Sequence, residues 1–510
     1  MTTGTLAAPR AVVDQADDAL PRLAKREVLL VAAGFVLLEL AVSARYGFHR
    51  DELYFLACAR HLAWGYVDQP PLVPAVAWLE THLFGTSPVS LRILPAFAAG
   101  GASVISACMA RELGGRRKAQ VLAALATATS PQVLAAFHLL STAAFDMFFW
   151  SAMCLVVLRF LRTGDQRLWL ALGVLTGLAL LNKLNVLFLL VALGVGLTAA
   201  GRARALLDRR AVVGGVLALL IWSPNIVWNA QHQWAALSML QSLHQENSSL
   251  GASLAFIPAQ LIVVGPVLVV LWLAGLRDLI RSPIAKPLGY AYLVLVVMFT
   301  LSGAKPYYLA GMYFLLFAAG AVWAERRLES RLPARGLRGW VLLMIVGGML
   351  ALPLSLPVLP ESTLPTGSWE GVINKDLSAT VGWQDFVKQI AGVASTLPAD
   401  QRADLVVFTG DYGAAGAIDL WGSEYRLPDA ISGHNTYWWW GPGSARDGAT
   451  TIAVNLSRSY LLTIFARVRS AGSVRTPGGV WTEERGDPIW ICQGQFRTWA
   501  EAWPEARHYG

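Results

Sequence analysis

The feature that most constrains this chain is a series of apolar blocks, each about 17 to 22 residues long and bounded by charged residues. A helix of about 20 apolar residues spans the ~30 Å hydrocarbon core of a bilayer. Hydrophobic residues make up 55% of the chain and charged residues only 15%, whereas soluble domains carry about 25% charged residues. The blocks therefore predict an α-helical polytopic membrane protein and exclude the soluble, fibrous and disordered classes.

The blocks predict about eleven transmembrane helices. They fall at 27–44, 88–110, 119–138, 143–161, 168–182, 184–200, 211–229, 258–276, 287–302, 306–323 and 339–358. We interpret residues 168–200 as two short helices that meet at Asn182–Asn185. A single long helix there would reverse the side of the membrane on which every later loop lies.

Lysine and arginine indicate the orientation of these helices, because cytoplasmic loops are enriched in both. With the N-terminus inside, the tail and the inside loops carry 23 Lys and Arg, when Arg159 at the end of its span is included. The outside loops carry 6, when the first of them is counted over 45–92. This asymmetry accounts for the net charge of +8 without nucleic acid. We expect a multi-pass protein of the cytoplasmic membrane with its C-terminal segment outside.

The composition changes after Pro360, where charged and turn residues become common. Short β-rich runs at 405–409 and 451–456, with a helical segment at 413–420, predict a small soluble α/β domain. The predicted division is a cytoplasmic tail at 1–26, a transmembrane domain at 27–358 with a catalytic outer loop at 45–87, and an extracytoplasmic domain at 359–510.

The densest polar segment follows the first apolar block and contains Arg50-Asp51-Glu52 and Tyr54. Charged groups next to hydrocarbon are costly and indicate a functional site, although a solvated loop is the simpler alternative. Residues 53–66 alternate at helical spacing, which predicts an amphipathic helix lying in the membrane interface. A third carboxylate, Asp68, precedes Gln69 and a stiff Pro-Pro turn.

This arrangement resembles the bacterial glycosyltransferases related to protein O-mannosyltransferases and to lipid A aminoarabinose transferase. The resemblance covers about 27–358, is most specific at 50–72 and is weaker at Asp146, Lys183 and Lys305-Pro306-Tyr307-Tyr308. It implies a GT-C fold with interfacial helices in the first outer loop. It also implies transfer of a sugar from a polyprenyl-phosphate carrier on the outer face of the membrane. This chain has Gln69 where relatives often have Lys.

Within that resemblance, Asp51 is the predicted general base, because the acceptor hydroxyl must lose a proton as it attacks the sugar. Glu52 is predicted to orient Asp51 or to bind sugar or metal. The departing phosphate needs cations, and the candidates are Arg50, Lys183 and Lys305. We expect single displacement with inversion. The further substrate-binding candidates are Tyr54, Asp68, Gln69, Asp146, Tyr307 and Tyr308.

A divalent metal is left open as a cofactor, because Asp51, Glu52 and Asp146 are carboxylates that could gather with His49 or His138. Spacing alone does not specify such a site. The aromatic run Trp438-Trp439-Trp440 suits either a sugar or packing and the bilayer interface, and we favour the second interpretation.

Two other classes of protein remain as alternatives. A transporter would show two related halves and broken helices near the bilayer midplane, and no internal repeat is visible. A non-catalytic envelope-assembly protein would not require the Asp51–Glu52 pair. The expected partners are a polyprenyl-phosphate sugar, an acceptor that is a lipid, glycan or protein, and membrane lipids, without nucleic acid.

Overall fold

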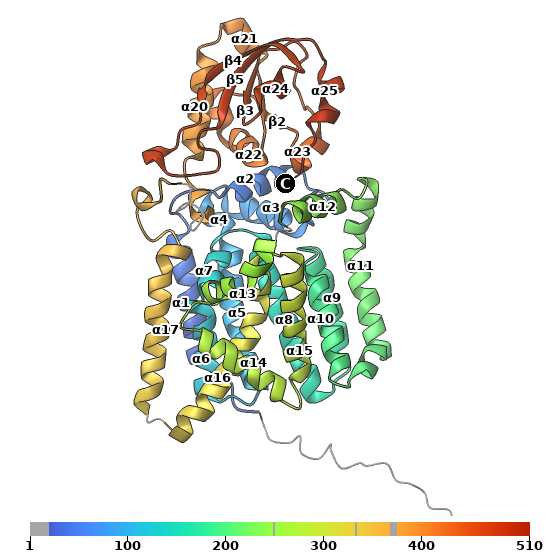
Figure 1. The fold of residues 1–510 in the computed structure, drawn as a ribbon, viewed down its shortest axis with the longest axis vertical. Helices are drawn as coiled ribbons and strands as arrows, with labels where there is room; N and C mark the ends of the chain where they lie inside the picture. Colours follow the sequence, from blue (N-terminus) through green and yellow to red (C-terminus); the bar gives the residue numbers. More distant parts are fainter. Residues whose placement is uncertain (1–19, 248–249, 332–333, 368–374, 510) are drawn as a thin grey trace, which may run out of the picture.

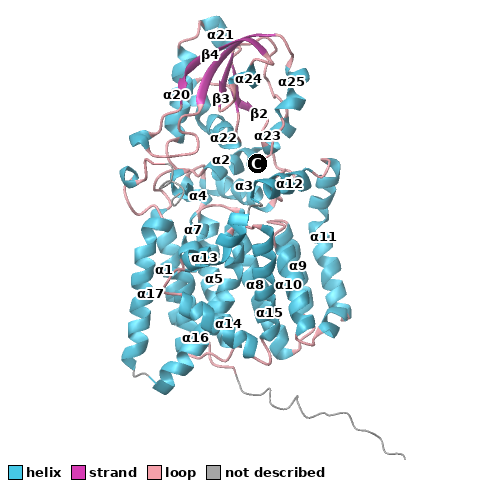
Figure 2. Cartoon of the chain, in the orientation of Figure 1, coloured by secondary structure: helices cyan, strands magenta, loops and turns pink. Residues whose placement is uncertain are grey.

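The computed structural model describes residues 20–509 except 248–249, 332–333 and 368–374. A bundle of long helices forms the lower part of the molecule, and a mixed sheet with flanking helices forms the upper part (Figures 1 and 2). A layer of short helices, lying across the bundle axis, separates the two parts. The polar segment after the first apolar block lies in this middle layer.

The bundle contains helices at all the predicted spans. Their bounds are α1 (Lys25–Val42), α5 (Ile93–Glu112), α6 (Arg117–Thr129), α7 (Pro131–His138), α8 (Thr142–Thr163), α9 (Leu168–Leu180), α10 (Val186–Ala199), α11 (Arg209–Gln231), α13 (Leu250–Val264), α14 (Val269–Arg281), α15 (Lys286–Ser302), α16 (Ala310–Arg331) and α17 (Ala334–Ser355). By length and composition, 5 helices of the described residues qualify as membrane spans, or up to 7 if each bent pair is one span.

Two predicted straight spans are wrong, because each is a bent pair of helices. The span 119–138 bends by 61° between α6 and α7, where Ser130 is extended and Pro131 begins the next helix. The span 258–276 bends by 111° between α13 and α14. The break there follows Gly265, whose φ of +90° ends a helix, and Pro266 cannot donate a backbone hydrogen bond.

The break predicted within 168–200 is confirmed. Helices α9 and α10 are separate, and the asparagines between them bond to α8 and its vicinity. Asn182 Nδ2 donates to the carbonyl of Thr142 at 2.9 Å, and Asn185 Nδ2 donates to Asp146 at 3.0 Å. These bonds satisfy polar groups of the turn, for which hydrocarbon would supply no hydrogen-bond partners.

The middle layer consists of α2 (Arg50–Arg60), α3 (Leu72–Phe84), α4 (Pro88–Leu91) and α12 (Ala235–Asn247). The prediction of an amphipathic helix over 53–66 is wrong in two respects. The helix ends at Arg60, and its residues from Glu52 to Ala59 are all buried. The reason is that α2 packs against α3 within the middle layer and against α22 (Tyr412–Trp421) of the C-terminal part.

The C-terminal part is built on a five-stranded sheet of order β2-β1-β3-β5-β4. Strand β1 pairs in parallel with β2 and β3, and β5 pairs antiparallel with β3 and β4. The predicted strands at 405–409 and 451–456 and the predicted helix at 413–420 are confirmed as β1, β3 and α22.

The strands of this sheet are β1 (Val406–Thr409), β2 (Ala430–Ser432), β3 (Thr451–Val454), β4 (Phe465–Ser473) and β5 (Pro488–Gln495). The accompanying helices are α19 (Lys375–Ser378), α20 (Trp383–Ser395), α21 (Ala399–Ala403), α22 (Tyr412–Trp421), α23 (Asn435–Trp440), α24 (Arg458–Leu461) and α25 (Trp499–Ala506). Short 3₁₀ turns occur at η1 (Ala203–Leu207), η2 (Pro306–Leu309), η3 (Glu361–Thr363), η4 (Gly422–Tyr425) and η5 (Pro477–Gly479).

Within the bundle, glycines allow α14 and α16 to pack closely. A Cβ on Gly275 would lie 2.0 Å from the carbonyl oxygen of Leu316, and one on Gly320 would lie 2.1 Å from the carbonyl oxygen of Leu271. Lipid tails are as apolar as the helix surfaces, so the hydrophobic effect does not drive helices together in a membrane. Close packing at small residues such as these drives their association instead.

We expect Gly320→Leu to destabilise the protein by about 1–3 kcal/mol, the usual cost of overpacking. Gly194→Leu is the matched control, because a Cβ there meets nothing within 4 Å. Thermal unfolding of both variants in detergent measures the difference. Equal unfolding midpoints for the two would contradict the packing argument.

Candidate active site

The first turn of α2 is built by a capping box that fixes two adjacent carboxylates. His49 is the extended N-cap residue, and its Nδ1 accepts the backbone N–H of Asp51 at 3.1 Å. The backbone N–H of His49 donates to Glu52 Oε2 at 2.8 Å. Reciprocal bonds of this type satisfy the free amides at a helix start, and the helix dipole stabilises acidic groups there.

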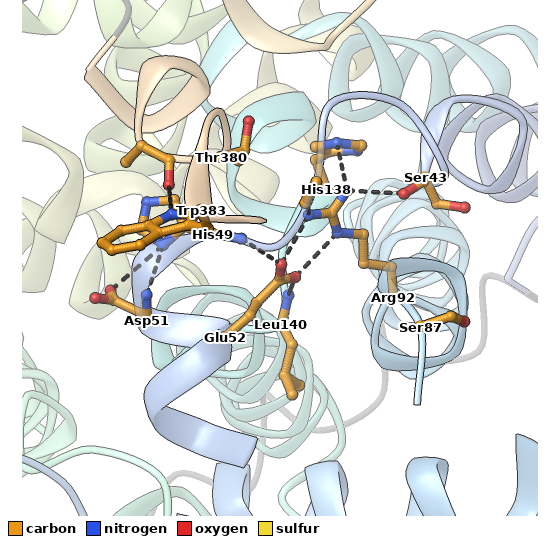
Figure 3. Close-up of polar contacts among 12 residues, drawn as sticks. Ser43, His49, Asp51, Glu52, Ser87, Arg92, His138, Leu140, Thr380 and Trp383 are labelled. Carbon is orange, nitrogen blue, oxygen red and sulfur yellow. Dashed lines mark hydrogen bonds and ion pairs between the residues drawn. The ribbon is translucent and has the colours of Figure 1, made fainter. Parts of the chain in front are cut away.

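Glu52 points into the bundle and is fully enclosed by hydrogen-bond donors (Figure 3). Arg92 donates to its two oxygens at 3.0 and 2.7 Å, and the backbone N–H of Leu140 donates at 3.1 Å. The Arg92 guanidinium also donates to the carbonyls of Ser43 and Gly47. Both charged side chains are buried.

This environment bears on the two roles predicted for Glu52. Its oxygens already bond to the protein, so the geometry does not support direct contact with sugar or metal. It favours the other predicted role, in which Glu52 orients Asp51 by fixing the first turn of α2.

Asp51 points away from Glu52, toward the C-terminal part of the chain (Figure 3). Its side chain is 38% exposed, and its Oδ1 accepts the hydroxyl of Tyr412 at 2.8 Å. Desolvation raises the pKa of Asp51, but the charges of His49 and Arg50, the Tyr412 hydroxyl and the charge of Lys305 lower it, with a net downward direction. Asp51 is therefore an accessible carboxylate that stays ionised at neutral pH, as a general base requires.

Arg50 lies beside Asp51, with its Nε 3.8 Å from Asp51 Oδ1. Its guanidinium pairs with Glu483, which also pairs with Lys375. Its Nε has no hydrogen-bond partner within the part of the chain that the structure describes. One N–H of this cation is thus buried without a hydrogen-bond partner, and the charge of the guanidinium is shared with the C-terminal part.

Tyr54 connects three segments through its hydroxyl. The hydroxyl lies 2.8 Å from Asp68 Oδ1 and 2.7 Å from Thr436 Oγ1, and the backbone N–H of Val67 donates to Thr436 Oγ1 at 3.0 Å. Desolvation raises the pKa of Asp68, and the nearby charge of Asp51 raises it further. Gln69 is buried next to this group.

A second cluster contains Asp146, Lys183, Tyr307 and Tyr308. The Lys183 ammonium lies 5.5 and 4.7 Å from the ring centroids of Tyr307 and Tyr308, and it interacts electrostatically with Asp146. The charges of both Lys183 and Asp51 act on Tyr307, and Lys305 acts on Asp51. The structure therefore brings the predicted base and the predicted phosphate-binding cations into one electrostatic neighbourhood.

The predicted metal-ligand set does not come together. Glu52 is paired with Arg92, and His138 lies 3.3 Å from Glu39 and 3.4 Å from Arg92. Among the residues described, no group of three His, Cys, Asp or Glu side chains has the geometry to hold a metal ion. Of the predicted set, only His49 lies near Asp51, with its Nδ1 3.9 Å from Asp51 Oδ2.

The aromatic run at 438–440 packs between three segments, in line with the favoured interpretation. Trp438 and Trp503 exchange indole-to-carbonyl hydrogen bonds of 2.8 and 2.9 Å. The ring of Trp439 meets His232 edge-on, with centroids 5.0 Å apart, and Trp440 stacks on His61 at 4.5 Å. The run joins the C-terminal part to the ends of α2 and α11.

Sequence reasoning missed three residues that shape this site, namely Arg92, Tyr412 and Glu483. For Arg92 a signal existed, because a lone arginine within an apolar block implies a buried partner. Tyr412 lies in Gly410-Asp411-Tyr412-Gly413, which shows glycines but gives no indication of a contact with Asp51. For Glu483, nothing in the surrounding sequence indicates its pairing with Arg50.

Comparisons with known proteins agree with this architecture. Residues 68–228 match the family described as dolichyl-phosphate-mannose-protein mannosyltransferase. The fold matches the crystal structure of ArnT from Cupriavidus metallidurans bound to undecaprenyl phosphate, with a TM-score of 0.64, 14% identity, and coverage of 92% of this chain and 98% of that one. The predicted class is confirmed: the chain is a membrane glycosyltransferase with the GT-C fold.

Two further matches refine this assignment. The apo structure of the same ArnT aligns with a TM-score of 0.62 and 15% identity over 92% of this chain and 98% of that one. Lipid A galacturonosyltransferase RgtD of Rhizobium johnstonii is 26% identical over 357 residues, which are 68% of this chain and 74% of that protein. The predicted resemblance to this group of glycosyltransferases is confirmed, and the transporter and assembly-protein alternatives are set aside.

We expect Arg92→Leu to destabilise the protein by about 3–5 kcal/mol, because it leaves Glu52 buried without its counter-charge. Arg117→Leu is the control, since Arg117 is 73% exposed and pairs with Glu27 at the surface, where such pairs contribute about 0–1 kcal/mol. Thermal unfolding in detergent checks both. If the two variants unfolded alike, Arg92–Glu52 would not hold α2 in place.

Proposed function

We propose that this enzyme transfers a sugar from a polyprenyl-phosphate donor to an acceptor hydroxyl on the outer face of the cytoplasmic membrane, with Asp51 as general base. The observation that carries the proposal is the shared neighbourhood of an accessible, ionised Asp51 and the cations Arg50, Lys183 and Lys305. A base for the acceptor and a positive environment for the leaving group are the two requirements of this reaction.

The donor class follows from the relatives and from the cations. One matched structure of ArnT contains undecaprenyl phosphate. Within the described residues, the structure gives Lys183 no ion pair at salt-bridge distance, and its ammonium lies against aromatic faces instead. An ammonium held in this way keeps its N–H donors for a phosphate, to which charge-assisted hydrogen bonds are strong. Arg50 adds a second positive charge beside Asp51.

The reaction then balances as a single displacement with inversion. Asp51 takes the proton of the acceptor hydroxyl while the acceptor oxygen forms a bond to the anomeric carbon. The bond from that carbon to the phosphate oxygen breaks, and the electron pair leaves on the phosphate. Lys183 and Arg50 neutralise the charge that develops there.

The acceptor that we propose is a hydroxyl group of a lipid A-type glycolipid. The support is the sequence similarity to a lipid A galacturonosyltransferase. An acceptor embedded in the outer leaflet would meet the site at the level of the middle layer, which contains α2.

For the membrane topology, we propose eleven crossings with the tail 1–26 cytoplasmic, the transmembrane domain at 27–358 and the domain at 359–510 outside. The asymmetry of 23 against 6 basic residues supports this orientation. The middle layer and the C-terminal sheet lie at the same end of the bundle (Figure 1), so the site would face the outer leaflet.

The function is tested by transfer kinetics with a synthetic short-chain polyprenyl-phosphate sugar and lipid A in detergent. We expect Asp51→Asn to lower kcat by about 10²–10⁴-fold, and Lys183→Ala to lower kcat and also to raise KM for the donor. Asp400→Asn is the control, because Asp400 is exposed on α21. Near wild-type turnover of Asp51→Asn would refute its role as base, and unchanged kinetics of Lys183→Ala would place the phosphate elsewhere.

The topology is tested by labelling single cysteines from outside intact cells with a thiol reagent that does not cross membranes. Cys58, Cys154 and Cys492 are buried and Cys108 is partly exposed, so the labelling uses a Cys108→Ala background. We expect Asp400→Cys to be labelled and Leu207→Cys, which is 81% exposed in η1, to be protected until the cells are lysed. The reverse pattern would overturn the proposed orientation.

A further inference from the structure

The C-terminal helix α22 lies directly against α2, and two glycines allow this contact. A Cβ on Gly413 would lie 2.3 Å from Cγ of Arg50, and one on Gly416 would lie 2.8 Å from the backbone carbonyl of Leu53. The spacing of three residues puts both glycines on one face of α22. The start of α22 is therefore held against the first turn of α2, where Asp51 lies.

Tyr412, the first residue of α22, is fixed from several sides. Its backbone N–H donates to His434 Nδ1 at 3.3 Å, and its ring lies 4.8 Å from the His434 ring and 4.7 Å from the Tyr54 ring. The N-cap Asp411 accepts the backbone N–H of Ala414 at 2.8 Å, which fixes the helix start. A side chain held in this way has little freedom to leave Asp51.

We propose that Tyr412 is a positioning residue for sugar transfer, which fixes the orientation of the Asp51 carboxylate through its hydroxyl and so makes the C-terminal domain part of the active site. This inference rests on the proposed function, in which Asp51 is the general base. The hydroxyl bonds to Oδ1 at 2.8 Å. The other oxygen, Oδ2, is then the atom that takes the acceptor proton.

The chemistry of Tyr412 suits a permanent hydrogen-bond donor. Burial raises the pKa of Tyr412, and the neighbouring charge of Asp51 raises it further, so the hydroxyl keeps its proton. A hydrogen bond to a carboxylate stabilises the ionised form. Removing the hydroxyl should therefore both loosen the carboxylate and raise its pKa.

The pH dependence of Asp51 has contributions from each packed element. The groups that face it are His49 and Arg50 on its own segment, Tyr412 on α22 and Lys305 before η2, and the carboxylate also acts on Asp68 and Tyr307. A Tyr412→Phe variant removes the Tyr412 hydroxyl and leaves all the other groups in place. A shift of the acid limb in that variant therefore reports the Tyr412–Asp51 bond.

The test compares Tyr412→Phe with Tyr460→Phe in the transfer assay. Tyr460 belongs to the same domain, and its buried hydroxyl has no hydrogen-bond partner within the described residues. For Tyr412→Phe we expect kcat to fall about ten- to a hundredfold, an unchanged KM for the donor, and an acid limb of the kcat profile moved to higher pH. For Tyr460→Phe we expect wild-type values.

The double variant Asp51→Asn with Tyr412→Phe separates this inference from the proposed function. If Tyr412 acts through Asp51, the double variant loses no more activity than Asp51→Asn alone. An inactive Asp51→Asn with a fully active Tyr412→Phe overturns the positioning role and leaves the base assignment intact. A Tyr412→Phe variant with a lower unfolding midpoint and an unmoved acid limb also overturns it, because that result indicates packing only. An active Asp51→Asn refutes the base assignment itself.

Discussion

The ion pair between Arg92 and Glu52 is the interaction on which the site depends. Burying two charges is costly, and here the cost is offset because each charge has several partners. Arg92 reaches the carbonyls after α1, Glu52 accepts the N–H of Leu140 before α8, and Glu52 also caps α2. One pair thus joins α2 to three parts of the bundle. Adjacent residues of a helix point about 100° apart, so fixing Glu52 directs Asp51 away from the bundle.

The opposite side of α2 depends on the C-terminal domain. Gly413 and Gly416 allow α22 to pack against α2, because a Cβ at either position would clash with Arg50 or Leu53. One continuous hydrophobic cluster runs from the bundle through α2 into this domain. Asp51 therefore lies between two distant parts of the chain. Its hydrogen bond to Tyr412 joins residues that are 361 positions apart in the sequence. The domain is a structural component of the site rather than an appended module.

The sequence predicted those features that depend on local pattern. The apolar blocks predicted the helices of the bundle, and the asparagines predicted the break after α9. The β-rich runs predicted β1 and β3. The bends at Ser130 and Gly265 were missed, because a proline or glycine in an apolar block has the same hydropathy whether the helix continues or turns. The burial of α2 was not predicted, because the helix that packs on it, α22, belongs to a distant segment of the chain. The periodicity of a single sequence contains no information on such contacts. Arg92 and Tyr412 were missed as site residues for the same reason.

The cations of the site show how a binding charge is kept available in a folded protein. Arg50 pairs with Glu483, a carboxylate that it shares with Lys375, and its Nε has no hydrogen-bond partner in the described structure. Lys183 lies against the rings of Tyr307 and Tyr308, an arrangement that stabilises an ammonium through the ring quadrupole without occupying all of its hydrogen-bond donors. A carboxylate in direct contact would instead compete with an incoming phosphate for the same charge. Asp146 avoids this competition because Asn185 holds one of its oxygens at 3.0 Å, so its charge stabilises Lys183 from a distance. The aromatic faces thus stabilise the cation and leave it able to bind an anion.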